Sequence, residues 1–150
     1  MPVSFYYAMA VALTLVLAWA ADNHVYQKLA MLLLFDWAST NVAVNYMGFE
    51  RAPMVIPSLD AVTAILVAMV GFASGSQTAL VVFCLYGAVG LAHVVGFASY
   101  NQGTYTYYAI LNVLFLLQLV TVGGPSASRI VLRAWFPRRR QRVRPYPARR

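Results

Sequence analysis

Five long apolar runs, separated by short polar connectors, organise the chain as far as about residue 125. A transmembrane helix needs about 20 mostly apolar residues to cross a hydrocarbon core of about 30 Å. The runs are continuous, whereas membrane-spanning strands show about ten residues of alternating polarity, so helices are expected rather than a barrel. The pattern predicts an all-α integral membrane protein in which residues 1–125 form a bundle of five transmembrane helices. The expected spans are residues 3–21, 29–47, 59–73, 78–98 and 106–122.

The connectors between these runs are too short to hold a soluble domain. Ser58 and Asp60 follow Pro57 at the start of the third run, and such residues are expected to cap a helix N-terminus. Glu50 lies beside Arg51, where a surface ion pair is a sufficient role. The acidic residues in this part of the chain are therefore interpreted as caps and surface groups.

Composition and charge point to the same class of protein. The chain is 61% hydrophobic and only 10% charged, whereas soluble proteins have about 45–50% apolar and about 25% charged residues. Nine of the eleven basic residues lie in the segment 129–150. Basic segments beside spans favour the cytoplasmic side, so five spans place the C-terminal tail in the cytoplasm and the N-terminus outside. The expected location is the cell membrane, crossed several times.

The second run carries polar side chains where lipid contact would be expected. At about 100° per residue, Asp36 and Thr40 lie about 40° apart on a helix. Asn41 and Asn45 lie roughly 140–180° away from Asp36. Charged and amide groups in hydrocarbon cost about 2–3 kcal/mol or more. The second helix is therefore expected at the centre of the bundle, with neighbours on two sides.

Two interpretations of this polar arc stay open. In the first, the amides and the hydroxyl form hydrogen bonds between helices, each worth under about 1 kcal/mol, and Asp36 is protonated or paired. In the second, Asp36 lies on a proton or cation path or lines a water-filled pore. His93, Asn112 and Gln118 belong to the same set of candidates. No second histidine is expected at the depth of His93, so a hydrogen-bonded core role is favoured over metal or haem ligation.

Small residues recur at helix-packing spacing in the third and fourth runs. Gly71 and Gly75 form a GxxxG pattern, and Ala88, Ala92 and Gly96 continue the small-residue spacing. Such positions let helix backbones approach closely, either within one chain or between chains. They are the expected helix-packing residues.

The C-terminal segment 126–150 is predicted to be a short amphipathic piece followed by a disordered, arginine-rich cytoplasmic tail. Basic clusters beside a membrane bind anionic lipids at about 1 kcal/mol per residue. Arginines interleaved with aromatic residues can also neutralise phosphates and stack on bases, so nucleic acid is the alternative partner. The residues expected to make these contacts are Arg129, Arg133, Arg138, Arg139, Arg140, Arg142 and Arg144.

An enzyme is not expected from this sequence. It shows no nucleophile paired with a base, no phosphate-binding loop and no metal-ligand cluster. Its single cysteine, Cys84, excludes an intrachain disulfide. No catalytic residue, metal or cofactor is therefore predicted.

Three functions are compatible with these features. Small size, polar residues within a span and a basic tail favour a membrane-permeabilising or channel-forming protein that acts as a homo-oligomer. In general layout the chain resembles a phage holin, although five spans exceed the number usual for that group. One alternative is a small ion- or proton-coupled transporter subunit that uses Asp36. The other is an accessory or assembly subunit of a larger membrane complex, which docks through its basic tail.

Overall fold

The computed structural model describes residues 2–99 and 105–135, and all secondary structure in these residues is helical. The prediction of an all-α bundle with five helices is confirmed. The elements are α1 (Pro2–Ala20), α2 (His24–Arg51), the 3₁₀ turn η1 (Ala52–Met54), α3 (Ile56–Ser74), α4 (Gln77–Ala98) and α5 (Tyr105–Trp135).

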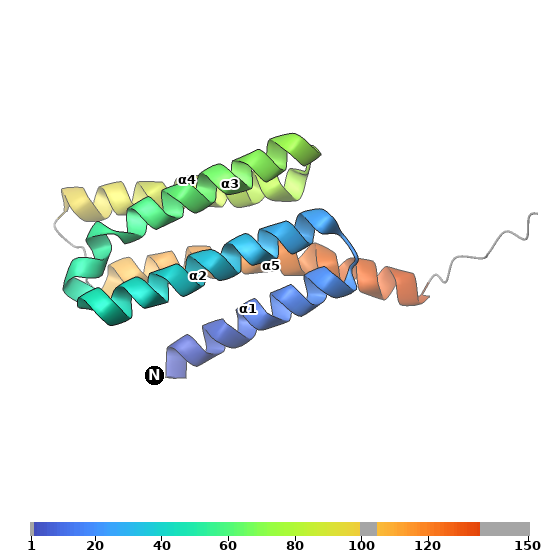
Figure 1. Ribbon diagram of the computed structural model, residues 1–150, viewed down its shortest axis with the longest axis horizontal. Coiled ribbons are helices and arrows are strands. Elements are labelled where there is room, and N and C mark those ends of the chain that lie inside the picture. The colour runs from blue at the N-terminus through green and yellow to red at the C-terminus, as the bar shows by residue number, and fades with distance from the viewer. Residues whose placement is uncertain (1, 100–104, 136–150) are drawn as a thin grey trace, which may run out of the picture.

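The helix α2 lies at the centre of the arrangement. Figure 1 shows α3 and α4 as an antiparallel pair, with α2 between this pair and α1, and with α5 running beside α2. Consequently α2 contacts α1, α3 and α5. The polar residues of the second run predicted neighbours on two sides of this helix, and the structure has three neighbouring helices there.

Local signals at both ends set the length of α2. Asn23 caps its N-terminus, because the side-chain oxygen accepts hydrogen bonds from the backbone N–H groups of Val25 and Tyr26. The first predicted connector is therefore mostly helical. At the other end, Gly48 adopts φ 76° and ψ 165° and kinks the helix. A side chain disfavours positive φ, so glycine suits this bend toward η1 and α3.

The start of α3 differs from its prediction. The helix begins at Ile56 with Pro57 in the first turn, and Val55 is the N-cap residue without a side-chain cap bond. Proline fixes φ near the helical value and lacks the N–H that the first turn leaves unpaired, so it can start a helix without a polar cap. Ser58 and Asp60 are inside the helix, and their predicted capping role is wrong.

The helix α5 extends well beyond the predicted fifth span. It continues through Pro125 to Trp135, so the amphipathic piece expected after Ser126 belongs to the same helix. Gly123 is buried there, and a Cβ added to it would lie 3.6 Å from Oγ1 of Thr14, so α5 packs closely on α1 at this point. The Ser126 hydroxyl donates to the carbonyl of Val122 at 2.8 Å. Tertiary packing thus stabilises the helix at Gly123, Gly124 and Pro125, which by themselves favour the end of a helix.

Three helices in the described part of the chain are long and apolar enough to cross a membrane by themselves: α3, α4 and α5. The apolar stretch of α1, Phe5–Ala20, is shorter. Lys28, Asp36 and the amides lower the hydropathy of α2. Length and composition therefore support three spans rather than the predicted five. Such helices are compatible with a membrane location.

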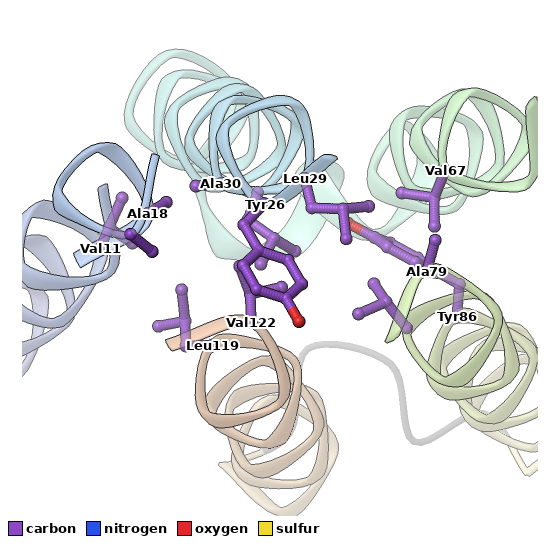
Figure 2. Packing of buried hydrophobic residues seen from close by; sticks show 13 residues of the cluster. Val11, Ala18, Tyr26, Leu29, Ala30, Val67, Ala79, Tyr86, Leu119 and Val122 are labelled. Carbon is purple, nitrogen blue, oxygen red and sulfur yellow. The ribbon is translucent and has the colours of Figure 1, made fainter. Parts of the chain in front are cut away.

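Small and branched apolar residues fill the core. In Figure 2, Val11 and Ala18 of α1 approach Leu119 and Val122 of α5, and the Tyr26 side chain extends from α2 toward α5. On the other side of α2, the core residues are Leu29, Leu33, Val67, Ala79, Val82 and Tyr86. The outward faces carry large apolar side chains instead, among them Ile65, Met69 and Phe72 of α3. An apolar core and an apolar outer surface together are typical of helices that contact lipid.

Candidate functional site

Asp36 lies in the middle of α2 and is only 5% exposed. The Tyr86 hydroxyl of α4 donates a hydrogen bond to its Oδ2 at 2.9 Å. Figure 2 shows the Tyr86 ring extending from α4 toward α2. The carboxyl group also lies within hydrogen-bonding reach of the Asp60 and Thr63 side chains of α3. Two carboxylates this close repel each other when both are charged, so the pair favours a proton or another cation between them.

A second polar cluster joins three helices. Nε2 of His93 in α4 lies 2.6 Å from Oδ2 of Asp60 in α3, and Nδ1 lies 2.6 Å from the hydroxyl of Tyr107 in α5. An ionised carboxylate only accepts, so Nε2 then donates to Asp60 and Nδ1 of a neutral ring accepts from Tyr107. His93 is 4% exposed and bonded at both ring nitrogens, which makes it a hydrogen-bonded core histidine.

Asp60 was interpreted from the sequence as a cap or surface group, and this interpretation is wrong. Its side chain is 12% exposed and pairs with His93. The signal that could have found the pair is the antiparallel order of α3 and α4. Asp60 lies near the start of α3, His93 near the end of α4 and Tyr107 near the start of α5. Consecutive antiparallel helices bring such positions to the same depth.

A pocket of about 330 Å³ lies beside Asp36, and all five helices contribute to its wall. We call it the polar pocket. Its polar lining residues are Asp36, Thr40, Asn41, Asp60, Asn112 and Gln118. Two carboxylates therefore face one cavity, and Asp60 connects that cavity to His93 behind it.

Aromatic rings form much of the remaining wall of the polar pocket. They are Tyr7 from α1, Trp37 from α2, Tyr86 from α4, and Tyr108 and Phe115 from α5. Among the described residues that line it, none is a lysine, arginine or histidine. Carboxylates and ring faces both attract positive charge, so the chemistry of the wall selects a proton or a cation over an anion.

The structure brings together most of the predicted path residues. Thr40, Asn41, Asn112 and Gln118 line the polar pocket with Asp36. Asn41 donates through Nδ2 to the Trp37 carbonyl at 2.7 Å, which fixes its amide on its own helix. Gln118 is 1% exposed, and its Nε2 has no partner.

Two predicted path residues lie elsewhere. His93 does not line the polar pocket and reaches it only through Asp60. Asn45 is exposed, as are Tyr46 and Met47 beside it, because neighbouring helices do not cover this end of α2. Within one copy of the chain Asn45 is therefore not covered by a neighbouring helix, although the polar arc of the second run was expected to face neighbours.

The small-residue pattern contributes one close helix contact and one helix end. A Cβ added to the buried Gly71 would lie 3.4 Å from Cβ of Ala79, so this glycine lets α3 approach α4 within the chain. Gly75 is instead the C-cap of α3, with φ 62°. Gly96 is buried in α4, and Ala88 and Ala92 are half-buried.

Two of the arginines predicted to contact lipid or nucleic acid are described, and both are exposed. The Arg129 guanidinium lies 4.9 Å from the centre of the Tyr26 ring, which links the end of α5 to the start of α2. Arg133 lies in the last turn of α5. The other predicted contacts, Arg138, Arg139, Arg140, Arg142 and Arg144, lie outside the described residues.

The part of the chain that the structure describes contains no group of three or more histidine, cysteine, aspartate or glutamate residues able to hold a metal ion. No protein-family model, no curated protein and no solved structure matches the chain.

Proposed function

We propose that the protein is a small ion- or proton-coupled membrane carrier that uses Asp36. One observation supports this proposal above the others: Asp36 is buried, lines the polar pocket and lies within hydrogen-bonding reach of a second carboxylate, Asp60. Ionisable groups inside membrane helices are expensive, and they mark ion and proton pathways in pumps and transporters. Two adjacent carboxylates are costly for packing alone, because their negative charges repel each other unless a proton or another cation lies between them.

The position of the polar groups favours a carrier over an oligomeric pore. Asp36, Asp60 and Gln118 face a cavity within one copy of the chain. A pore between copies would need a largely polar outer face, whereas the outer face of α3 carries large apolar residues such as Ile65 and Phe72. A binding site inside the bundle suits a carrier, which holds its substrate before releasing it on the other side.

The proposed topology places all five helices in the membrane, with the N-terminus outside and the basic tail in the cytoplasm. The support for α2 is its position, since α1, α3 and α5 pack around it and Asp36 is buried among them. The support for α1 is its apolar stretch Phe5–Ala20, packed against α5. The positive-inside rule supports the side assigned to the tail.

Proton flux into liposomes tests the carrier. The purified chain is reconstituted with a pH-sensitive dye inside the vesicles, and a potassium diffusion potential drives cations inward. We expect acidification of the lumen that Asp36→Asn reduces by at least about tenfold, because the amide cannot take up a proton. Asp22→Asn is the matched control, since Asp22 is exposed and does not line the polar pocket. Equal flux in the two variants would exclude Asp36 as the carrier.

An oligomeric, holin-like pore is the second proposal, and the exposed amide of Asn45 supports it. A polar side chain on the outer face of α2 could contact another copy. A pore predicts escape of an entrapped small dye, loss of membrane potential and arrest of growth on expression. A carrier predicts retention of the dye.

The accessory-subunit hypothesis has a separate test, because its proposed docking segment lies outside the described residues. It predicts a partner that co-purifies with the full chain and is lost when residues 137–150 are removed. It also predicts neither flux nor dye release.

A further inference from the structure

We infer that the polar pocket binds a small organic ammonium ion, with its N–H groups donated to the Asp36–Asp60 carboxylate pair and an apolar body held against the aromatic wall. This inference rests on the proposed function, because it names the substrate class of the same site. The observations behind it are the adjacent carboxylates of Asp36 and Asp60, the composition of the wall and the size of the pocket.

The two carboxylates are stabilised by a cation between them. Asp36 lies within hydrogen-bonding reach of Asp60, and both side chains line the polar pocket. Two negative charges this close repel each other, so a donor that carries positive charge stabilises the pair. An ammonium group is a donor and a cation at once, and a charge-assisted hydrogen bond to a carboxylate is about twice as strong as a neutral one.

The aromatic wall favours binding of an organic cation over an inorganic one. Tyr7, Trp37, Tyr86, Tyr108 and Phe115 line the pocket from four helices. Ring faces attract ammonium ions and also pack against hydrocarbon, particularly when the site is shielded from water. Inorganic cations of the calcium or magnesium type need about six oxygen ligands, which a wall built largely of rings does not supply.

The size of the pocket limits the ligand. Its volume of about 330 Å³ is near the lower end of ligand pockets, which range over about 300–1,000 Å³. Asn112 lines the pocket and is also exposed, so the pocket reaches the surface of the bundle at α5. A single ring with a short aminoalkyl chain is an appropriate probe for such a site.

Trp37 provides the readout, because it lies in the wall of the polar pocket. The other two tryptophans, Trp19 and Trp135, are exposed. In the Trp19→Phe, Trp135→Phe background, Trp37 is the one remaining indole in the chain. The full chain is purified in detergent and titrated with phenethylammonium, while calorimetry on the chain with its native tryptophans measures the same affinity independently.

The matched ligand is 2-phenylethanol, which keeps the ring and chain but lacks the charge. We expect phenethylammonium to change Trp37 emission with saturation, and 2-phenylethanol to bind at least about tenfold more weakly. Asp36→Asn should weaken the binding of phenethylammonium by at least about tenfold, whereas Asp22→Asn should leave it unchanged. Circular dichroism checks that each variant is folded. If Asp36→Asn does not fold, the comparison of the two ligands on the parent chain decides the question.

Several results would overturn the inference. These are equal binding of the alcohol and the ammonium ion, unchanged affinity in a folded Asp36→Asn chain, or saturation of Trp37 by sodium or potassium ions alone. The flux assay separates this failure from that of the proposed function. If flux depends on Asp36 but phenethylammonium does not bind, the carrier proposal stands and the proposed substrate class is wrong. Binding without any flux contradicts the carrier itself.

Discussion

Nε2 of His93 lies 2.6 Å from Oδ2 of Asp60, and both side chains are buried between α3 and α4. The same imidazole contacts the Tyr107 hydroxyl of α5 at 2.6 Å. One ring therefore connects three helices, and Asp60 in turn lines the polar pocket beside Asp36. The pair both stabilises the bundle and fixes the position of a carboxylate at the candidate site.

Replacement of this histidine should destabilise the protein strongly. In His93→Ala, the Asp60 carboxylate loses its ring donor, and removing one partner of a buried pair costs about 3–5 kcal/mol. We expect the melting temperature in detergent to fall by about 10 °C or more. His24→Ala is the matched control, because His24 is exposed and its Nδ1 lies 3.2 Å from Oε1 of Gln27 on the surface. Similar melting temperatures for the two variants would contradict a structural role for the pair.

Removal of the Tyr86 hydroxyl should affect Asp36 specifically. In Tyr86→Phe, the ring remains in the core, but Oδ2 of Asp36 loses its donor. Hydrogen bonds to charged groups contribute about 1.5–3 kcal/mol, so a fall in melting temperature of several degrees is expected. Tyr6→Phe, a change at an exposed tyrosine, should have no effect. Scanning fluorimetry of the two variants measures the difference, and an unchanged Tyr86→Phe chain would show that the bond adds little.

Helix periodicity predicted the elements well where packing and local signals agree. The fourth run was expected at 78–98, and α4 spans Gln77–Ala98. Ser76 caps it with an oxygen that accepts from the backbone N–H of Ala79, a local signal of the usual kind. The central position of α2 followed from the cost of placing Asp36 in lipid, and its three neighbouring helices agree.

The prediction failed where a distant contact decides the outcome. Gly123, Gly124 and Pro125 read as an end of a helix, yet α5 continues because Gly123 packs on Thr14 of α1. Asp60 likewise read as a cap, because its partner His93 lies 33 residues away along the chain. Sequence alone supplied Asp36 as a candidate, but the polar pocket depends on five helices and required the structure.

The contact between α3 and α4 should tolerate a methyl group at Gly71 but no larger side chain. A Cβ there lies 3.4 Å from Cβ of Ala79, at the edge of ordinary contact. Gly71→Ala should therefore keep the melting temperature, helped by the better helix propensity of alanine. Gly71→Leu should lower the stability by about 1–3 kcal/mol through overpacking. Gly87→Leu is the control, since no atom lies within 4 Å of a Cβ at that position. Equal effects of the two leucines would show that α3 and α4 do not approach closely at Gly71.

Replacement of Gln118 should raise the stability of the protein and weaken its function. Its side chain is 1% exposed in the wall of the polar pocket, and Nε2 has no partner, although a buried unpaired donor costs about 1–3 kcal/mol. Gln118→Met keeps a similar length and removes that donor, so we expect the melting temperature to rise by a few degrees. The same change should weaken flux in liposomes, because it removes a polar group that faces the ligand. Leu117→Met, at an exposed position of the same helix, should alter neither quantity. A Gln118→Met chain that is less stable than the parent would show that the amide has a structural partner, and unchanged flux would show that it does not contact the transported ion.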